Sequence, residues 1–600
     1  MIRTIFTKNW WKKKWSGNGG KDYKMATWRF YFVLCWIAIL FFALVARLVY
    51  NQFFNADFLV SKANDRLLRT IKGGMERGLI ADRNGERLAV SVPVGDIYID
   101  RHDFKENQTH LKYEAELREM AKLLDIDYDW LLGRILDPKA GRVLSVKRRV
   151  DAKYVEFIAG LHLRGVYVEN TLRRYYPTAE INAHVLGRTD LDGNGTEGVE
   201  RQFNDYLLSV PEKSRLLKDR HGNVVEYLGV VREARHARNL VLSIDERIQQ
   251  KAYLALKYAT EINQATSGSL VLLDAWTGEI LAMVNSPSYN PNQKDGYEPY
   301  KARNRAVTDL YEPGSTTKPL IALKALALGK TSWQEVFNTY SFIVNGKSIT
   351  DSHKMASGDL FNILKYSSNT GMARIALRME PAELKSALTD FGYGTPTGVG
   401  FIGENKGRIP ARSHWSEIDK ATMGFGYGFM VTPLQIAQAY SILANHGIKR
   451  PLSILKVNQQ DIPAGERVAN EKDVNRVLEA LEAVVEDGTG TQAAIAGYRI
   501  GGKTGTAKVA IAGGYGKDYV GAFAGIAPMS NPRFVMVVII NEPHAGKFYG
   551  GTVAGPVFAQ VMERTLQLYN IPFDNLNADG SLRTPAQTRR EMYKRRATAH

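Results

Sequence analysis

Twelve residues, Gly497–Lys508, read GYRIGGKTGTAK and separate two possible folds for the C-terminal half of the chain. Their first eight residues fit G-x-x-x-x-G-K-[ST], the pattern of phosphate-binding loops in nucleotide hydrolases. Such a loop must run from a strand into a helix, whose N-terminal amides hold the phosphates. Here the flanks of Lys503-Thr504-Gly505 alternate and contain β-branched residues, and no helical pattern appears before the glycine-rich AGGYGKDY at 512–519. We therefore predict a strand, in which glycines let a ligand approach the backbone closely.

Composition limits the classes of protein to which the chain can belong. Its 600 residues, 44% of them hydrophobic, can bury large cores and predict two to four domains. The formal net charge of +17 lies mostly near the ends: eight basic residues face one acidic residue before the first apolar run, and six face one from Arg583 onward. The remaining excess of positive charge is spread too thinly along the chain to form a surface that binds the phosphate backbone of a nucleic acid. We therefore expect no nucleic-acid partner.

An uncharged apolar run, Phe30–Ala46, predicts a transmembrane helix over residues 28–50. A cleaved signal peptide is the alternative, but Ala43 and Ala46 are one residue too far apart for a small-x-small cleavage site. The positive-inside rule keeps the basic tail, residues 1–27, in the cytoplasm and places the rest of the chain outside that membrane. ATP is absent there, which is a second argument against the phosphate loop.

The exported part divides by pattern into two modules and a tail. We predict an elongated non-catalytic pedestal over 51–238, in which Asn84-Gly85 marks a hairpin and helix-like patterns dominate from His110 to Ala159. A second module spans 239–574. The basic segment 575–600 is expected to be poorly ordered.

The second module has the pattern of a sheet with helices packed on it. Two apolar runs within Gly268–Pro287 flank Trp276-Thr277-Gly278 and predict a hairpin, and Arg533–Pro543 predicts a further strand. Helical patterns lie between these runs. The fold class is therefore α/β, more narrowly α+β, with a mixed sheet and flanking helices.

Two short motifs in this module suggest chemistry. Ser315 and Lys318 form S-x-x-K, and if a helix begins near Pro313 or Gly314, both lie on one face and the amine can reach the hydroxyl. A neutral lysine can then remove the serine proton and make the oxygen a nucleophile. The pattern alone is weak, because about two matches are expected by chance in a chain of this size.

The second motif is S-x-N, formed by Ser367 and Asn369 at the predicted start of a helix. Its ordinary interpretation is a helix cap, just as a solvated lysine is the ordinary interpretation of S-x-x-K. However, S-x-x-K, S-x-N and K-T-G follow one another in this order along the chain. The ordered set is far more specific than any of the three motifs alone.

The ordered set resembles the signature of penicillin-binding proteins and serine β-lactamases. Three further stretches, RGLIADRNGE, RRYYPTAEINAHVLGRTD and GTEGVERQF, resemble class B penicillin-binding proteins. The stretches GYRIGGKTGTAK and INEPHAGKFYGGTVAGPVF are most similar to the division-specific, septal peptidoglycan transpeptidases of Gram-negative bacteria. The resemblance runs from the apolar segment to about Leu568.

This resemblance implies a D,D-transpeptidase that cross-links peptidoglycan stem peptides through a serine ester and is acylated and inhibited by β-lactams. Ser315 would be the nucleophile and Lys318 the base, with burial and the charge of Lys503 lowering the pKa of Lys318. Ser367 would relay a proton to the leaving amine, and Asn369 would orient Lys318 or the substrate amide. No cofactor and no metal are expected.

The resemblance also implies a substrate-binding set, which comprises Lys503, Thr504, Gly505, Thr506, Phe548 and Tyr549. Lys503, Thr504 and Thr506 would hold the terminal carboxylate of D-Ala-D-Ala. The backbone amides of Ser315 and Thr506 would form the oxyanion hole. Phe548 and Tyr549 would wall the cleft, although simple packing is the more common role of such an aromatic pair.

Location and partners follow from the same resemblance. The expected partners are the D-Ala-D-Ala donor and diamino-acid acceptor stem peptides, the inner membrane, a SEDS-family glycan polymerase and other divisome membrane proteins. The expected location is the inner membrane, with one span, a cytoplasmic N-terminus and a periplasmic catalytic domain. The alternatives are an elongation-specific class B transpeptidase and a β-lactam-binding divisome scaffold or sensor. A β-lactamase fits less well, because hydrolysis needs neither the anchor nor the pedestal.

Overall fold

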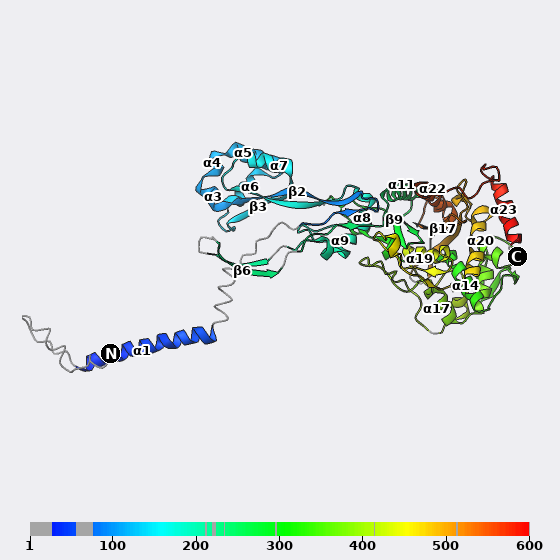
Figure 1. Ribbon diagram of the computed structural model, residues 1–600, viewed down its shortest axis with the longest axis horizontal. Coiled ribbons are helices and arrows are strands. Elements are labelled where there is room, and N and C mark those ends of the chain that lie inside the picture. Colours follow the sequence, from blue (N-terminus) through cyan, green and yellow to red (C-terminus); the bar gives the residue numbers. More distant parts are fainter. Residues whose placement is uncertain are drawn as a thin grey trace, which may run out of the picture. The chain divides into compact units, whose positions relative to one another are not determined.

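The structure is a computed structural model that describes residues 27–55, 76–210, 213–218, 224–232, 235–293, 297–412, 414–511 and 514–598. They form two compact units. The first contains α1 (Thr27–Val49), the π-helical turn η2 (Tyr50–Phe54), and a hairpin of β5 (Lys213–Lys218) and β6 (Val224–Arg232). In the described part of the chain, Thr27–Phe53 is the one helical segment long and apolar enough to cross a membrane. The predicted anchor is therefore a continuous helix (Figure 1), and the basic tail before Thr27 lies outside the described residues.

The pedestal part of the second unit is built on a small sheet, in the order β3-β2-β1-β7 with β4 paired to β2. The long strand β2 (Arg87–Asp100) pairs antiparallel with β3 (Val143–Asp151) and β4 (Val166–Tyr175). β1 (Ile80–Ala81) joins β2 through the predicted Asn84-Gly85 turn, which is thereby confirmed. β7 (Leu240–Val241) pairs parallel with β1, so this strand from beyond residue 238 completes the pedestal sheet.

Short helices pack against this sheet around a core that contains Ile97, Phe104 and Leu131. The helix-like pattern from His110 to Ala159 is confirmed for its helices, but β3 interrupts it, because the sheet requires a third long strand there. The pedestal helices are α3 (Arg101–Glu106), α4 (Thr109–Lys112), α5 (Glu114–Leu123), α6 (Tyr128–Leu136), α7 (Ala152–Gly160), η3 (Ala179–Ile181), α8 (Ala183–Leu186), α9 (Gly198–Gln202) and α10 (Asn204–Leu207).

The rest of the second unit surrounds a five-stranded sheet in the order β16-β17-β18-β8-β9. β8 (Ser267–Asp274) and β9 (Glu279–Ser286) form the predicted hairpin, and β18 (Phe534–Asn541) is the predicted further strand. β16 (Gly501–Ile511) and β17 (Gly514–Ala527) form a second hairpin. The α+β fold class is confirmed, with one correction: every pair of neighbouring strands in this sheet is antiparallel, so the sheet is not mixed.

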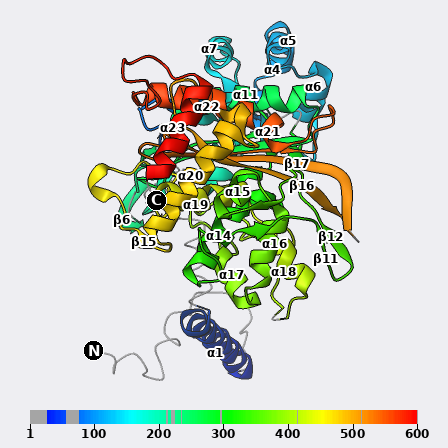
Figure 2. The same ribbon diagram turned by 90° about the vertical axis from the view of Figure 1, so that its right-hand side faces the viewer.

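Helices cover both faces of this sheet, because side chains along the central strands alternate between two cores. Along β18, Val535 and Val537 join one core, whereas Met536 and Val538 join the other. Figure 2 shows α11 and α22 above the sheet and the group around α14 and α17 below it. The covering helices are α11 (Glu246–Ile262), α14 (Lys318–Ala327), α15 (Leu360–Lys365), α16 (Asn369–Leu377), α17 (Pro381–Thr389), α18 (Glu417–Met423), α19 (Pro433–Ala444), α20 (Glu471–Asp487) and α22 (Gly555–Leu568).

The C-terminal segment forms a helix, α23 (Pro585–Thr598), instead of the poorly ordered tail that we predicted. It lies against α20 (Figure 1). Arg595 pairs with Glu482 at 2.9 Å, and Arg596 pairs with Asp359 at 2.8 Å. The basic residues that suggested a solvated tail are thus partners of acidic groups on the folded domain.

Candidate active site

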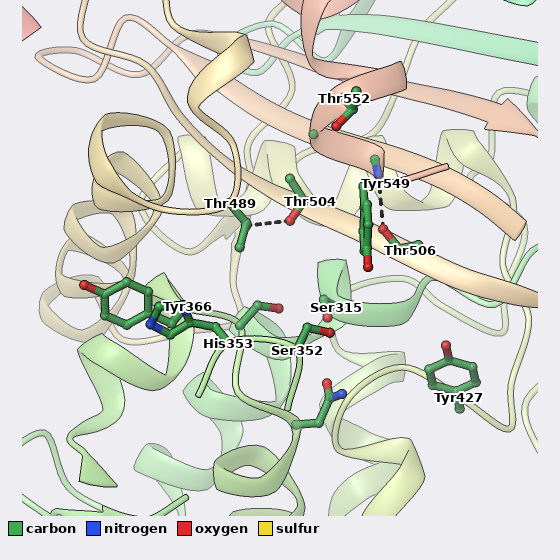
Figure 3. Close-up of a pocket in the computed structure, with 14 residues that line it drawn as sticks. Ser315, Ser352, His353, Tyr366, Tyr427, Thr489, Thr504, Thr506, Tyr549 and Thr552 are labelled. Atoms are coloured by element: carbon green, nitrogen blue, oxygen red, sulfur yellow. Dashed lines mark hydrogen bonds between the residues drawn. The ribbon is translucent and has the colours of Figure 1, made fainter. Parts of the chain in front are cut away.

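The S-x-x-K motif, the S-x-N motif and strand β16 all contribute residues to the lining of one cavity of about 430 Å³. Six of the predicted site residues line it, namely Ser315, Ser367, Asn369, Thr504, Thr506 and Tyr549. In Figure 3, Thr504 and Thr506 on β16 lie above Ser315, and His353 and Tyr366 lie to one side of it. The two predicted lysines, Lys318 and Lys503, are fully buried next to this cavity rather than in its lining.

Ser315 lies in the 3-10 turn η4 (Gly314–Thr317), directly before α14, which confirms the predicted helix start. Close backbone approaches fix this turn. Gly314 has a φ of +54° and donates its N–H to the carbonyl of Gly426 at 3.0 Å. A Cβ at Gly505 would lie 3.1 Å from the carbonyl oxygen of Pro313. Glycine in β16 therefore lets the strand pack tightly against the turn that carries the serine.

Lys318 is the first residue of α14 and joins the two motifs. Its Nζ donates hydrogen bonds to the carbonyl of Ser367 at 2.6 Å, the hydroxyl of Ser367 at 3.1 Å and Oδ1 of Asn369 at 2.8 Å. Burial lowers the pKa of Lys318 well below that of an ordinary lysine, and the charge of Lys503 lowers it further. The predicted contact with the hydroxyl of Ser315 is not among the hydrogen bonds of Lys318 in the described residues.

The S-x-N motif lies at the start of α16, as predicted, and its backbone forms a strained turn. Ser367 has a φ of +61°, a left-handed conformation that is uncommon for residues other than glycine and that strains the backbone. Ser368 caps the helix by accepting a hydrogen bond from the amide of Gly371 at 3.0 Å. The cap belongs to the middle serine, so Ser367 and Asn369 are free to face Lys318.

Asp351 holds this turn in place. Its carboxylate accepts hydrogen bonds from the amides of Asn369 at 2.5 Å and Thr370 at 2.9 Å. It also accepts from the hydroxyls of Ser368 at 2.6 Å and Thr370 at 2.7 Å. Four bonds to one carboxylate fix the S-x-N backbone, and with it the acceptors of Lys318.

β16 supplies the opposite wall. It is the terminal strand of the sheet, so its outer edge has no strand partner among the described residues. Lys503 on this strand is fully buried, and its Nζ donates to the carbonyl of Thr504 at 3.3 Å. Burial lowers the pKa of Lys503 to about 7. The strand continues to Ile511 and turns into β17, so no helix follows Lys503 and the phosphate loop is excluded.

Two threonines of β16, Thr504 and Thr506, line the cavity, and a neighbouring residue contacts the hydroxyl of each. Oγ1 of Thr504 lies 2.7 Å from Oγ1 of Thr489, which also lines the cavity. Oγ1 of Thr506 accepts a hydrogen bond from the amide of Gly550 at 3.1 Å. Figure 3 shows both contacts as dashed lines. Each hydroxyl keeps bonding capacity for a ligand in the cavity.

The predicted aromatic pair has two different placements. Tyr549 is 56% exposed and lines the cavity, as expected. Phe548 does not line it and packs instead between Tyr549 and Tyr519, with its ring centroid 4.2 Å from that of Tyr519. A further aromatic pair, His353 stacked on Tyr366 at 4.3 Å, lies on the side of the S-x-N turn.

Several site residues were missed from the sequence, namely Asp351, Ser352, His353, Tyr366, Tyr427 and Thr489. Thr489 belongs to Asp487-Gly488-Thr489-Gly490, a turn composition after an amphipathic helix, which could have indicated a loop near the site. Asp351 carries no comparable local signal, because its partners begin seventeen residues later in the chain.

Comparison with known families gives two matches. The family described as "Penicillin binding protein transpeptidase domain" matches residues 268–563. The family described as "Penicillin-binding Protein dimerisation domain" matches residues 73–242. Along the chain, the dimerisation match therefore precedes the transpeptidase match.

Individual relatives are similar over nearly the whole chain. The peptidoglycan D,D-transpeptidase FtsI of Escherichia coli strain K12 is 42% identical over 92% of this chain and 93% of its own. The probable peptidoglycan D,D-transpeptidase PenA of Neisseria gonorrhoeae is 38% identical over 93% of this chain and 96% of its own. A peptidoglycan synthetase from Bifidobacterium adolescentis has a similar structure, with a TM-score of 0.67 and 28% identity over 86% of this chain and 98% of its own.

Proposed function

Because the chain belongs to the class B penicillin-binding proteins, we propose that it is a septal peptidoglycan D,D-transpeptidase in which Ser315 is the nucleophile. The observation that carries this proposal is the buried amine of Lys318, which is held by Ser367 and Asn369 one helical turn from Ser315. An amine with a lowered pKa beside a serine in an open cavity is the arrangement that acyl transfer needs.

In the first step, Oγ of Ser315 attacks the carbonyl carbon of the penultimate D-Ala of a donor stem peptide. The serine proton passes to the neutral amine of Lys318. The C–N bond to the terminal D-Ala breaks, and Ser367, hydrogen-bonded to Lys318, relays a proton to the departing amine. The products are an ester on Ser315 and free D-Ala.

In the second step, the amine of an acceptor stem peptide attacks the ester carbonyl and loses a proton through the same Lys318–Ser367 pair. The C–O bond breaks, and Oγ of Ser315 regains its proton. The new amide is the cross-link. The amides of Ser315 and Thr506 hold the oxyanion in both steps, because η4 and the outer edge of β16 lie against each other at the cavity.

The terminal carboxylate of the donor is bound by the hydroxyls of Thr504 and Thr506, with the buried charge of Lys503 behind them. A β-lactam carries a carboxylate and a strained amide in a similar relation, so it acylates Ser315. The acyl group then blocks the cavity. This accounts for β-lactam binding by the same residues that bind the substrate.

Septal use, rather than elongation, is supported by the FtsI relatives, which are 37–42% identical to this chain. The apolar helix Thr27–Phe53 is compatible with a single-pass inner-membrane protein. By the positive-inside rule, the N-terminus lies in the cytoplasm and the cavity in the periplasm. Partners are then a SEDS-family glycan polymerase and other divisome membrane proteins. Localisation of the tagged protein along the side wall instead of at the septum would favour the elongation-specific alternative.

Covalent labelling tests the catalytic assignment. Fluorescent penicillin should attach to the full-length protein and not to Ser315→Ala, and Ser332→Ala, which changes a serine outside the cavity lining, is the matched control. Labelling that survives in Ser315→Ala would refute the nucleophile. Turnover of a D-Ala-D-Ala thioester with an added amine separates an enzyme from a scaffold or sensor, and slow release of the penicilloyl group separates a transpeptidase from a β-lactamase.

A further inference from the structure

A second cavity, of about 710 Å³, lies on the pedestal and shares no lining residue with the active site. Five arginines line it, namely Arg148, Arg149, Arg173, Arg174 and Arg188. Asp190 is the one acidic residue in its lining. The second module (residues 239–574) contributes Pro291, Asn292 and Gln293 to the lining. Two hydrogen bonds join Asn292 to the backbone of Tyr176.

A β-bulge brings two of these arginines to the same cavity. In the ladder between β2 and β3, Arg148 and Arg149 together face the single residue Asp96. The carboxylate of Asp96 accepts from the amide of Arg149 at 2.7 Å and from Nε of Arg148 at 3.0 Å. Arg149 has a φ of +59°. The bulge leaves both arginines opposite Asp96, and both line the cavity.

Arg149 has no carboxylate partner among the described residues. Arg148, Arg173 and Arg188 each form an ion pair with an acidic side chain. The guanidinium of Arg149 donates instead to the backbone carbonyl of Asp190 at 2.8 Å. The carboxylate of Asp190 is occupied by the amides of Asp192 and Asn194. A half-buried cation is therefore left with a neutral acceptor at the cavity.

Arg174 provides an independent indication. It is only 7% exposed, and its Nε donates to Glu200 at 2.6 Å. The fully buried Glu200 also pairs with Arg77 at 2.5 Å, so one carboxylate neutralises two cations and a positive charge remains. Nη2 of Arg174 is buried and has no hydrogen-bond partner. An unsatisfied donor on a buried cation is costly, so the positive charge behind this part of the lining is incompletely compensated.

We propose that this cavity binds the stem-peptide carboxylates of an uncross-linked glycopeptide strand, outside the catalytic cleft. A carboxylate accepts two parallel N–H bonds from a guanidinium, a geometry that suits the half-buried Arg149, while the buried Arg174 adds positive charge behind the lining. Its volume of about 710 Å³ lies within the range of small-ligand sites. Tyr175, which is 41% exposed, also lines the cavity and adds an aromatic side chain of the kind that sugars contact. The inference rests on the proposed function, which brings such strands to the protein.

Binding of a fluorescent disaccharide-pentapeptide to the full-length protein in detergent tests this site. The protein is first acylated with penicillin, so that the catalytic cleft is occupied. Arg149→Gln and Arg173→Gln should each raise the dissociation constant about tenfold, as should amidation of the probe's carboxylates. Arg142→Gln removes an exposed pedestal arginine that does not line the cavity, and it should leave binding unchanged.

Three outcomes would overturn the proposal: unchanged affinity in both cavity variants, equal binding of the amidated probe, or equal binding of a hexaglutamate peptide, which would indicate an acidic protein segment. Penicillin labelling should be equal in wild type and Arg149→Gln. If penicillin labels neither protein, the proposed function fails. Carboxylate-dependent binding that Arg149→Gln weakens would still support the arginine site, so the two failures are distinguishable.

Discussion

The ammonium of Lys365 lies 2.6 Å from the carboxylate of Asp487, and this ion pair joins the two walls of the active-site cavity. Two residues beyond Lys365 the chain reaches Ser367, and two residues beyond Asp487 it reaches Thr489. Tyr593 of α23 accepts a hydrogen bond from Lys365 at 2.5 Å and donates one to Asp487 at 3.2 Å. The pair and its tyrosine therefore position a proposed proton relay and a binding hydroxyl together.

Asp487→Asn should slow acylation by penicillin about tenfold and lower the free energy of unfolding by about 1–3 kcal/mol. The reason is that Lys365, with only 2% of its side chain exposed, loses its anionic partner, while Asp487 is 38% exposed and water compensates in part. Stopped-flow acylation and thermal unfolding measure the two effects. Glu471→Gln breaks the exposed Arg467–Glu471 pair and is the control. It should leave the acylation rate unchanged and alter the free energy of unfolding by no more than about 0.5 kcal/mol. Acylation at the wild-type rate in Asp487→Asn would contradict the positioning role.

Truncation before Pro585 removes α23 and should also slow acylation. The reason is that α15 and α20 then lose the contacts that Tyr593, Arg595 and Arg596 make with them. The decrease in acylation rate should be larger than in Tyr593→Phe, which removes only the hydroxyl. Labelling kinetics of the truncated, Tyr593→Phe and wild-type proteins make the comparison. A truncated protein with unchanged stability and unchanged labelling would show that α23 is a passive tail.

Asp351→Asn should slow acylation about tenfold to a hundredfold, because an amide cannot accept all four hydrogen bonds that hold the S-x-N turn. Its NH₂ group would also face donors. The amplitude of penicillin labelling at long times should be retained, since Ser315 is intact. Asp461→Asn, at an exposed position at the end of the 3-10 turn Gln459–Asp461, is the control and should acylate normally. An unchanged rate in Asp351→Asn would mean that the strained turn is held by its own backbone.

Local patterns predicted the parts of the catalytic module that local forces determine. The alternation around Lys503 predicted β16, and the two apolar runs around Trp276-Thr277-Gly278 predicted the β8–β9 hairpin. The order of Ser315, Lys318 and Ser367 along the chain predicted that these residues gather at one site, because the resemblance supplied the long-range arrangement that spacing alone cannot. The predicted hydrogen bond between Lys318 and Ser315 is not among those of the described residues. Their catalytic roles stay predictions until labelling and turnover are measured.

What the sequence did not predict depends on distant partners. The basic charges of α23 indicated a solvated tail, but Glu482 and Asp359, more than a hundred residues away, pair with them. β3 was hidden within a helix-like region, since its strand character comes from pairing with β2. Asp351 belongs to no motif, and its role follows only from the fold of the S-x-N turn around it.

The rate of acylation should rise with pH and reach a plateau well below pH 10, because the base must be neutral and the pKa of Lys318 is lowered by burial and by Lys503. Asp351 acts in the opposite direction and raises this pKa. In Asp351→Asn the rising limb should therefore move to lower pH, even though the maximal rate falls. Acylation rates between pH 5 and pH 9, a range chosen to bracket neutrality, test the shift. A limb that moves to higher pH would contradict the assignment of Lys318 as the titrating base.

Lys503→Met should stabilise the fold at pH 7 by a few kcal/mol while weakening penicillin binding. Lys503 is fully buried, and its pKa falls from 10.5 in the unfolded chain to about 7 in the folded protein. Between these values the unfolded chain binds more protons, so wild-type stability gains from Lys503 as pH rises, and the penalty is largest at and below pH 7. The advantage of Lys503→Met in thermal unfolding should therefore shrink from pH 7 to pH 10. An advantage that is independent of pH would show that Lys503 is stabilised as a cation by a partner. That result would also remove the argument that its buried charge is kept for the substrate carboxylate.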